Sequence, residues 1–496
     1  MVFWLSSHYL KPKKLNILIL SSCSLRSDRI GTYKGHLLTP NISKLAANSF
    51  VFDNAFTDMS WSNVSGFLSR LTIADLKKFG YSAIGEPWIK DDSIWYNFAA
   101  ETPAFYYETP SIYRFDQKTK SNYLKNLSAI KNIIPDDSKR PLLFDEPDGP
   151  ARFRWSLMKL FSDKSNYSQD LSKIKNSILN KSQWPFLLEV HSKIMHFPYG
   201  GGFPDSPSIK YLLSEESKIY IEEYEKNVKK YSERLPFGLY FHQGRKSIDS
   251  VIRTLNLEKK LADKIINLET NPTFLGILNN KAILDKWQKS KYFDRDLEII
   301  KETYDKRLML YDASLKEILE LYGNSDLLDN TVVIFTGDHG ESFLEHGYLT
   351  HGETVYDEMI HFPLFIKFPG QKVGEKINYQ FYQKSIYDVV KKIMSGEINP
   401  DNFKKNIENE VQSEFIYSRN CSNDMVSLRY RNEWKLIQDF RVDKKYLYNL
   451  NSDPKELVDV YEQFPDIANF LVEKSIEVLA VQQKNKMVYP CTESNN

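Results

Sequence analysis

Two apolar runs stand out in the pattern of hydrophobic and polar positions along the chain. One spans residues 15–20, and the other spans residues 332–336 and leads directly into the polar sequence GDHGE at 337–341. Such runs are typical of strands buried on both faces of a parallel sheet, and residues 184–191 form a third example. Open α/β sheets place their chemistry at the carboxyl ends of such strands. We therefore predict a functional site where the first two runs end.

Helical periodicity marks several segments between the predicted strands. Before the strand at 332–336, apolar side chains recur at intervals of three and four residues and predict an amphipathic helix ending at Gly323. These side chains are Tyr304, Leu308, Tyr311, Leu315, Ile318 and Tyr322. A second helix is predicted over residues 386–394, capped by Ser385 and stopped by Gly396. The charged block at about 205–300 has a helical pattern too, with one solvated helix between Ser214 and Lys230.

Short alternating segments from about residue 415 onward predict a different architecture. Residues 427–430 and 434–437 are suited to pair across a turn at 431–433, and residues 446–450 follow as a further strand. The predicted fold class is therefore α/β, with a mostly parallel sheet flanked by helices over residues 15–400. Within it, about 205–300 is a candidate helical insertion. Residues 415–482 are predicted to form a small C-terminal subdomain with an antiparallel sheet.

Composition and charge narrow the function classes. The 496-residue chain has a formal net charge of +1, which argues against nucleic acid as the main partner. No stretch approaches the roughly 18 apolar residues of a membrane-spanning helix. Three cysteines cannot all pair, and their spacing does not resemble a disulfide framework. Aromatic clusters such as Trp95-Tyr96 suit either a sugar or lipid groove or ordinary packing.

Asp338 and His339 are the first candidates for chemistry. They stand side by side at the end of a predicted buried strand, and His346 and His351 follow within thirteen positions, although the chain has only 9 histidines. A neighbouring Asp and His can hold a cation, and a further His can hold an anion. The alternative is a turn whose polar residues serve only as caps.

This segment resembles the sulfatase branch of the alkaline phosphatase superfamily. The likeness rests on the Asp-His-Gly that follows the strand, on Tyr-Asp-Glu at 356–358 and on Pro-Leu at 363–364. The order of segments at 15–20, 24–29, 39–46 and 50–56 is similar to the start of these proteins. The resemblance implies an alkaline-phosphatase-like sheet. It also implies that Asp338 and His339 are metal ligands and that His351 contacts the ester anion.

Cys23 is the first departure from the family pattern. It occupies the position at the end of the first strand where the family has a metal-binding Asp. The resemblance implies calcium or magnesium as the divalent metal ion, whereas a thiolate ligand suits zinc better. The alternative is a small buried cysteine with no ligand role.

Cys23 also ends the sequence LSSC at 20–23, which resembles a lipoprotein cleavage site. The apolar run before it has six residues, fewer than the roughly 7–15 of a signal core. Cleavage would also remove the first strand of the fold. We find no convincing signal peptide, although members of the family are mostly exported, and the localisation stays open.

Ser62 aligns with the nucleophile of the family, which is a Cys or Ser followed by x-Pro-x-Arg and oxidised to formylglycine. Val64 and Gly66 replace the Pro and the Arg, so we expect no formylglycine. A plain hydroxyl at a helix N-terminus still suits a nucleophile, because free N–H groups there bind anions and a metal lowers the pKa of the hydroxyl. The alternative is that Ser62 only caps the helix. Glu86 stands near the place of a family Lys and reverses its charge.

His196 follows the run at 184–191 in the sequence HFPY. The family places a His-x-Pro-Tyr there, and its His faces the leaving group. A histidine can protonate a leaving oxygen because it titrates near neutral pH. A packed loop histidine is the alternative.

These observations predict a metal-assisted hydrolase that acts on a sulfate or phosphate ester of a small molecule, a glycan or a lipid. Ser62 is the candidate nucleophile, with His196 and His351 as further catalytic residues. One alternative is a degenerate, non-catalytic member that keeps the fold and binds a ligand or partner, which Cys23, Gly66 and Glu86 favour. Another is a phosphoryl-group transferase of the same superfamily. The sequence leaves the ester type, the metal and the oligomeric state open.

Overall fold

The computed structural model describes the chain in separate stretches, the longest of which covers residues 325–410. The described residues are 14–33, 39–60, 78–79, 82–83, 154–156, 179, 184–192, 195, 213–232, 283–320, 325–410, 413–420, 425–439 and 443–484. Ser62 and His196 lie outside these residues, as do Val64, Gly66 and Glu86. The predictions made for them therefore rest on the sequence.

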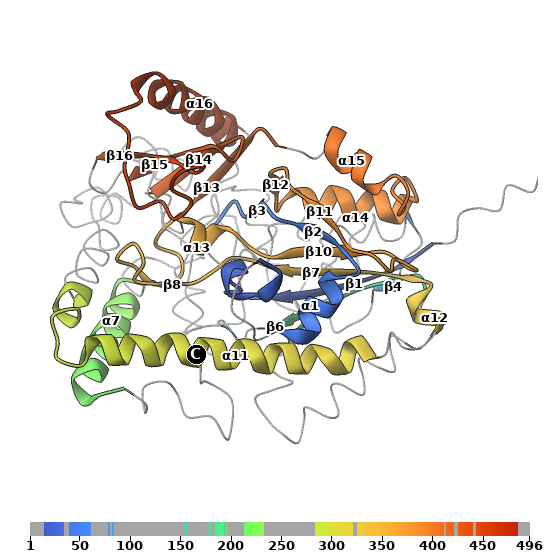
Figure 1. The fold of residues 1–496 in the computed structure, drawn as a ribbon, viewed down its shortest axis with the longest axis horizontal. Helices are drawn as coiled ribbons and strands as arrows, with labels where there is room; N and C mark the ends of the chain where they lie inside the picture. Colours follow the sequence, from blue (N-terminus) through green and yellow to red (C-terminus); the bar gives the residue numbers. More distant parts are fainter. Residues whose placement is uncertain are drawn as a thin grey trace, which may run out of the picture.

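An eight-stranded, mostly parallel sheet forms the centre of the described structure (Figure 1). Its order is β11-β2-β10-β7-β1-β6-β4, and β5 pairs with β6. The bounds are β1 Asn16–Ser22, β2 Phe50–Phe52, β4 Ser82–Ala83, β5 Arg154–Ser156, β6 Phe186–Ser192, β7 Thr331–Gly337, β10 Leu364–Lys367 and β11 Glu375–Ile377. Only β10 runs antiparallel to its neighbours among these described strands. The predicted α/β class is confirmed.

The three predicted apolar runs are the central strands β1, β6 and β7. Every residue of β1 and β7 is buried, because the sheet is covered on both faces. Side chains alternate between the two faces, as strand geometry requires. Leu18 and Leu20 belong to one hydrophobic core, and Ile17 and Ile19 belong to the other.

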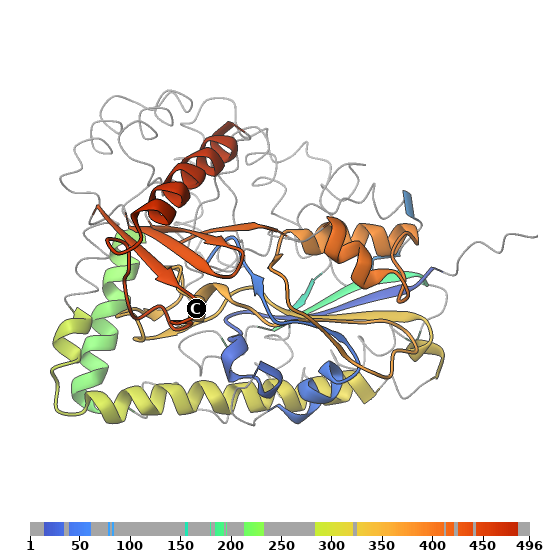
Figure 2. The ribbon, with the colours of Figure 1, turned by 45° about the horizontal axis from the view of Figure 1, so that its top comes forward.

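Helices cover the two faces of this sheet in separate layers (Figures 1 and 2). α1 Pro40–Ala46 and α11 Phe293–Glu320 pack on one face. α14 Ser385–Ser395 and α15 Phe403–Glu410 pack on the other. The apolar stripe predicted for α11 is buried from Tyr304 to Ile318. The amphipathic helix is therefore confirmed, while its predicted end at Gly323 lies outside the described residues.

α14 begins one residue earlier than the sequence suggested. Its N-cap is Lys384, and no side chain provides a capping hydrogen bond, so Ser385 is the first helical residue and the prediction of a Ser385 cap is wrong. The chain enters this helix almost directly from β12 Phe381–Tyr382, so Lys384 is the N-cap and Ser385 the first residue of the helix. Gly396 ends the helix with a φ of 80°, the left-handed conformation that glycine adopts readily.

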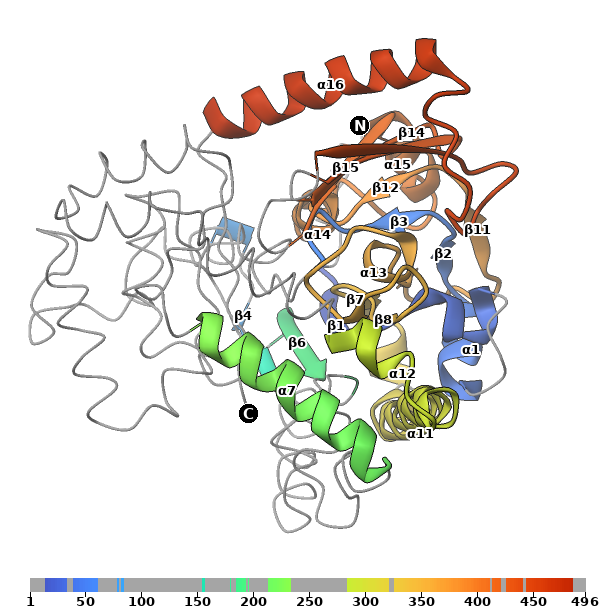
Figure 3. The ribbon, with the colours of Figure 1, turned by 90° about the vertical axis from the view of Figure 1, so that its left-hand side faces the viewer.

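The C-terminal part of the described chain forms a four-stranded antiparallel sheet on which one helix packs (Figure 3). Its elements are β13 Phe415–Arg419, β14 Met425–Tyr430, β15 Trp434–Asp439, β16 Lys444–Asn449 and α16 Pro465–Lys484. Tyr430 pairs with Trp434 across the turn, as the sequence predicted. The domain boundaries at 15–400 and 415–482 remain a prediction.

A buried ion network attaches this C-terminal sheet to the main domain. Nζ of Lys435 lies 2.8 Å from Asp357 Oδ1 and 2.5 Å from Glu456 Oε1, and Arg429 also pairs with Asp357. Burial opposes ionisation of Asp357, but the charges of Arg429 and Lys435 hold its pKa well below the usual range. Asp357 begins the short helix α13 Asp357–Ile360, so the network fixes the C-terminal sheet against the segment that follows β7.

The charged middle block contributes α7 Glu215–Ser232, which confirms the helix predicted there. Two hydrogen bonds hold its start against the region of α11: Trp287 Nε1 donates to Ser217 Oγ at 2.7 Å, and the backbone N–H of Ser214 donates to Asp296 Oδ2 at 3.0 Å. Residues 233–282 lie outside the described chain, so an insertion at 205–300 stays a prediction.

None of the helices in the described stretches combines the length and apolar character needed to cross a bilayer.

Gly340 offers a test of how tightly the segment after β7 is packed. A Cβ at this position would lie 1.9 Å from the backbone oxygen of Glu358. We expect Gly340→Ala to destabilise the protein by about 3 kcal/mol, because backbone must move to make room. Gly31→Ala is the control, since its Cβ would meet Ser43 Oγ at an ordinary 3.6 Å and should cost no more than about 0.5 kcal/mol. Equal unfolding midpoints in urea for the two variants would contradict the packing.

Candidate functional site

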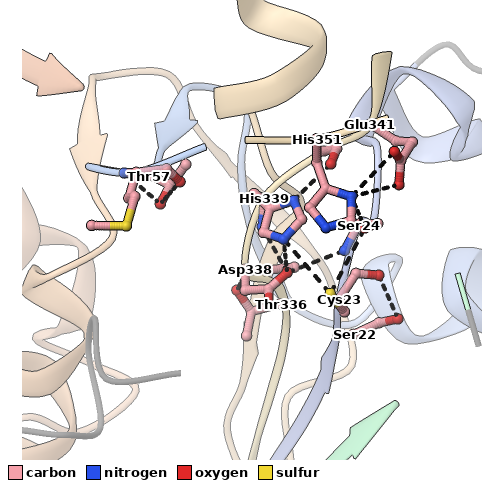
Figure 4. Close-up of polar contacts among 12 residues, drawn as sticks. Ser22, Cys23, Ser24, Thr57, Thr336, Asp338, His339, Glu341 and His351 are labelled. Carbon is pink, nitrogen blue, oxygen red and sulfur yellow. Dashed lines mark hydrogen bonds and ion pairs between the residues drawn. The ribbon is translucent and has the colours of Figure 1, made fainter. Parts of the chain in front are cut away.

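Three potential metal ligands meet at the carboxyl ends of β1 and β7 (Figure 4). The two strands are parallel, and Ser22 pairs with Gly337. The residues that follow, Cys23 on one strand and Asp338 and His339 on the other, are therefore neighbours. One ligand atom from each of the three lies within 4.8 Å of the others, and all three residues are buried. The predicted gathering of Cys23 and Asp338 at one sheet edge is confirmed.

The carboxylate of Asp338 is held through one oxygen and leaves the other for a ligand. Oδ1 accepts hydrogen bonds from the backbone N–H groups of Ser24 at 3.2 Å and His339 at 2.8 Å. Ser24 reaches it with a φ of 55°, in the left-handed region. Oδ2 is buried and accepts no hydrogen bond from the described residues. Such a group is costly to bury, so a cation bound at Oδ2 would offset the cost.

His339 presents the nitrogen that a metal needs. Its Nδ1 lies 2.7 Å from the backbone oxygen of Gly340, and because that oxygen can only accept, Nδ1 carries the proton. Nε2 is therefore the basic nitrogen, and it lies 3.6 Å from Cys23 Sγ and 3.7 Å from Asp338 Oδ1. Orientation of a ligating histidine by a backbone carbonyl is common in metal sites.

The residues present fit a borderline or soft divalent metal. A sulfur, an imidazole nitrogen and a carboxylate oxygen together form a donor set typical of zinc, whereas calcium and magnesium prefer oxygen ligands throughout. Three protein donors with a further position for water or substrate is also the usual arrangement of catalytic zinc sites. Cys23, Asp338 and His339 could hold such an ion.

His351 lies beside this cluster, as the sequence predicted for an anion contact. Its ring centroid is 4.7 Å from that of His339, and the ring planes make an angle of 33°. Nδ1 lies 3.2 Å from each carboxylate oxygen of Glu341 and 3.4 Å from Ser24 Oγ. These contacts orient the ring through Nδ1.

Glu341 is a site residue to which the sequence analysis assigned no role. It is fully buried and faces His351 (Figure 4). Burial raises the pKa of Glu341 to about 8, although the neighbouring His339, Ser24 and Arg26 act in the opposite direction. The sequence feature that could have identified Glu341 as a site residue is its position in the polar stretch directly after β7.

Arg26 and Tyr304 hold the loop after β1 in place. Nη1 of Arg26 donates to the backbone oxygen of Glu341 at 2.8 Å and to Glu345 Oε1 at 2.6 Å. The hydroxyl of Tyr304 accepts from the Arg26 backbone N–H at 2.9 Å and donates to the Ser24 backbone oxygen at 2.7 Å. α11 thereby supports the loop that carries Cys23 and Ser24.

His346 does not join the ion site, although the sequence grouped it with the other two histidines. Its Nδ1 lies 2.9 Å from Glu358 Oε1, and its Nε2 lies 3.2 Å from the backbone oxygens of Lys455 and Glu456. Its ring stacks on Tyr356 with a centroid distance of 3.6 Å. His346 therefore joins the segment after β7 to the C-terminal region. The sequence could not show this contact, because Lys455 and Glu456 lie more than a hundred residues away.

Comparisons with known proteins agree with this geometry. The sulfatase family model matches residues 15–395. Arylsulfatase K of Homo sapiens is 29% identical over 223 residues, which is 40% of this chain and 41% of that protein. Arylsulfatase K of Canis lupus familiaris is 26% identical over 222 residues, again 40% and 41% of the two chains. The matched region thus covers about two fifths of these curated relatives.

Solved structures share the fold at lower identity. One is a protein in complex with D-glucosamine-2-N,6-O-disulfate, named as its substrate, with a TM-score of 0.53, 17% identity and coverage of 96% of this chain and 98% of that chain. Another is the phosphonate monoester hydrolase of Agrobacterium radiobacter, with a TM-score of 0.52, 15% identity and coverage of 94% and 96%. These likenesses confirm the alkaline-phosphatase-like fold.

The contacts of His346 predict a pH-dependent contribution to stability. Burial lowers the pKa of His346, but the hydrogen bond and charge of Glu358 outweigh burial and raise it. The protonated form is therefore favoured in the folded state. Its stabilisation is complete below the unfolded pKa of about 6.5 and is lost as the pH rises through the folded value. We expect His346→Gln to destabilise the protein more at pH 6 than at pH 9, as measured by urea unfolding.

His361→Gln provides a control of opposite sign. Burial lowers the pKa of His361, so the neutral form is favoured in the folded state. Its stabilisation is present above the unfolded pKa and is lost as the pH falls through the folded value. This variant should lose more stability at pH 8 than at pH 5. A stability loss for His346→Gln that stays constant between pH 6 and pH 9 would rule out the assigned role.

Proposed function

The chain belongs to the sulfatase family, and on this premise we propose that it hydrolyses a sulfate or phosphate ester. The observation that carries the proposal is the meeting of Cys23, Asp338 and His339 beside His351. A fold needs no such group for its own stability, because replacing buried charged and polar groups with apolar ones often leaves stability unchanged. A cation next to an anion contact is what ester cleavage requires.

Members of the family typically use a divalent metal, and the ligands proposed here favour zinc. Cys23 would contribute a thiolate, Asp338 its free Oδ2 and His339 its Nε2. When bound, the metal would supply positive charge that lowers the pKa of a nearby hydroxyl and stabilises negative charge on the ester. Side chains of this chain would provide the nucleophile, the proton donor and the contact to the anion.

In the proposed reaction, Ser62 attacks the sulfur or phosphorus of the ester. Ser62 Oγ first loses its proton to solvent. The bond from Oγ to that atom then forms while the bond to the leaving oxygen breaks, and His196 donates a proton to the leaving oxygen. His351, held at Nδ1 by Glu341, contacts a non-bridging oxygen. Water then cleaves the covalent intermediate and releases sulfate or phosphate. In a transferase, an acceptor alcohol would take the place of this water.

The substrate class proposed is a small-molecule or glycan ester. Support comes from the sulfated glucosamine named as the substrate of one structural neighbour and from the phosphonate monoester hydrolase that shares the fold. The degenerate, non-catalytic alternative draws on the sequence alone, since Gly66 and Glu86 replace basic residues of the family. Assays with aryl sulfate, aryl phosphate and phosphodiester substrates distinguish these cases.

The metal site can be tested with Asp338→Ala. We expect this variant to bind zinc at least about 100-fold more weakly and to lose ester hydrolysis, because a charged ligand is removed. Asp312→Ala is the matched control: Asp312 is also buried, but its carboxylate accepts from Asn41 and Ile42 instead. Asp312→Ala should lower stability and leave zinc binding intact. Zinc content is measured by metal analysis after dialysis.

Cys23→Asp tests the choice of metal directly. The new oxygen donor should move the preference from zinc toward magnesium or calcium. If the wild type binds none of zinc, calcium, magnesium and manganese while Cys23→Asp does bind, the degenerate alternative replaces the proposed function. Ester hydrolysis that survives both Asp338→Ala and Ser62→Ala would defeat the proposed mechanism.

The state of Ser62 is a further prediction. We expect intact-mass and peptide mass spectrometry to show an unmodified serine, because Val64 and Gly66 break the formylglycine signal. Ser62→Ala should reduce kcat by about 1000-fold or more, as expected for loss of a nucleophile. Ser65→Ala, which removes a hydroxyl from the same segment, is the control and should retain most activity. Formylglycine at Ser62 would contradict the prediction.

A further inference from the structure

The proposed reaction requires two separate segments to keep a fixed relative position. One is the end of β7, which carries Asp338 and His339. The other leaves β3 Ala55–Phe56, passes through residues 57–60 and reaches Ser62 two residues later. β3 does not belong to the central sheet but pairs with β12 in a separate two-stranded sheet. Strand pairing within the central sheet therefore does not fix these two segments against each other.

Gln383 joins the two segments directly. Its Nε2 donates to the backbone oxygens of Asp338 at 2.8 Å and Gly337 at 3.3 Å. Its Oε1 accepts from the hydroxyl of Thr57 at 2.8 Å. Gln383 and Thr57 are both buried, with exposures of 1% and 0%. The N–H donors of this buried amide thus bond the segment that carries the proposed metal ligands. Its oxygen accepts from the segment that leads to Ser62.

Further contacts make the segment from Thr57 to Ser60 a defined structure. Oγ1 of Thr57 also lies 3.3 Å from the Met59 backbone N–H, and the backbone oxygen of Thr57 accepts from Ser418 Oγ at 2.6 Å. The Ser60 backbone N–H donates to the Arg419 backbone oxygen at 3.1 Å. The segment is therefore held by β13 on one side and by Gln383 on the other.

We propose that Gln383 is a positioning residue, which through Thr57 fixes residues 57–60, the segment that leads to Ser62 in the sequence, relative to Asp338. This inference rests on the proposed function. Both halves of the amide are required, since a carboxylate could not donate to the Asp338 oxygen and an alkyl chain could not accept from Thr57. A displacement of about 1 Å between reacting groups can lower a rate about 100-fold. Loss of the amide therefore lowers the rate of the chemical step more than it lowers binding.

The chain offers a matched control in Gln380. This glutamine is also buried and also makes three hydrogen bonds: its Nε2 donates to the backbone oxygens of Ser413 and Glu414, and its Oε1 accepts from the Asn432 backbone N–H. All three partners lie in the C-terminal part of the chain, and none of them is a proposed site residue. Gln380→Ala and Gln383→Ala remove equivalent sets of bonds, and only the second involves the site.

The first measurement is steady-state ester hydrolysis by the zinc-loaded protein. We expect Gln383→Ala to lower kcat by about 10–100-fold while KM changes by less than about 3-fold. Gln380→Ala should lose similar stability and keep kcat within about 3-fold. Thr57→Val should match Gln383→Ala, Thr57→Ser should restore the wild-type rate, and the double variant Thr57→Val/Gln383→Ala should be no worse than either single one. A kcat for Gln383→Ala equal to that of Gln380→Ala overturns the proposal.

A second measurement does not depend on turnover. Hydrogen exchange of the backbone amides of residues 58–60 should become at least about 10-fold faster in Gln383→Ala and stay unchanged in Gln380→Ala. If the wild type cleaves no ester, the proposed function fails, and this measurement alone decides whether Gln383 holds the segment. Equal exchange in the two variants would overturn the positioning role even in an active enzyme.

Discussion

The parallel, in-register pairing of β1 with β7 is the constraint on which the site depends. Ser22 lies opposite Gly337, so the chain leaves both strands at the same level of the sheet edge. Cys23 and Asp338 then become neighbours although they are 315 positions apart in the numbering. Because side chains alternate between faces, a slip of one residue would turn the whole apolar set of a strand toward the opposite face. The two faces pack against different cores, so the fit of each side chain in its own core secures the register and, with it, the site.

Support for the site comes from elements on every side of this edge. Tyr304 of α11 bonds the loop after β1, and Gln383 before α14 bonds the backbone after β7. The ion pair of Lys435 with Asp357 secures the segment that follows β7 in the chain. His346 bonds to Glu358 in the same segment. These contacts hold the segments around the sheet edge, and Asp338 Oδ2 accepts no hydrogen bond from the described residues.

Local patterns were sufficient for much of the fold and for the central part of the site. Apolar runs identified β1, β6 and β7, helical periodicity identified α11, and the Asp-His-Gly after β7 identified two residues of the buried cluster that could hold a metal ion. The failures involve contacts between distant segments. The role of His346 depends on the position that residues 455–456 take beside its ring. The role of Gln383 depends on the course of the chain after β3, which brings Thr57 to it. Neither residue has a periodic or motif signal, because a single hydrogen bond to a distant backbone leaves no local pattern. The Ser385 cap was wrong for a similar reason, since the path from β12 decides where α14 begins.

Charge balance gives a physical reason why Cys23 can stand in the position of an aspartate. A thiolate and a carboxylate each carry one negative charge, so Cys23 and Asp338 together would neutralise a divalent ion, with His339 bound as a neutral imidazole. What the cysteine changes is the character of the donor, since sulfur binds zinc strongly and calcium or magnesium poorly. A cysteine here is thus compatible with a site whose net charge is that of the family pattern but whose metal differs, and it need not indicate a site that has decayed.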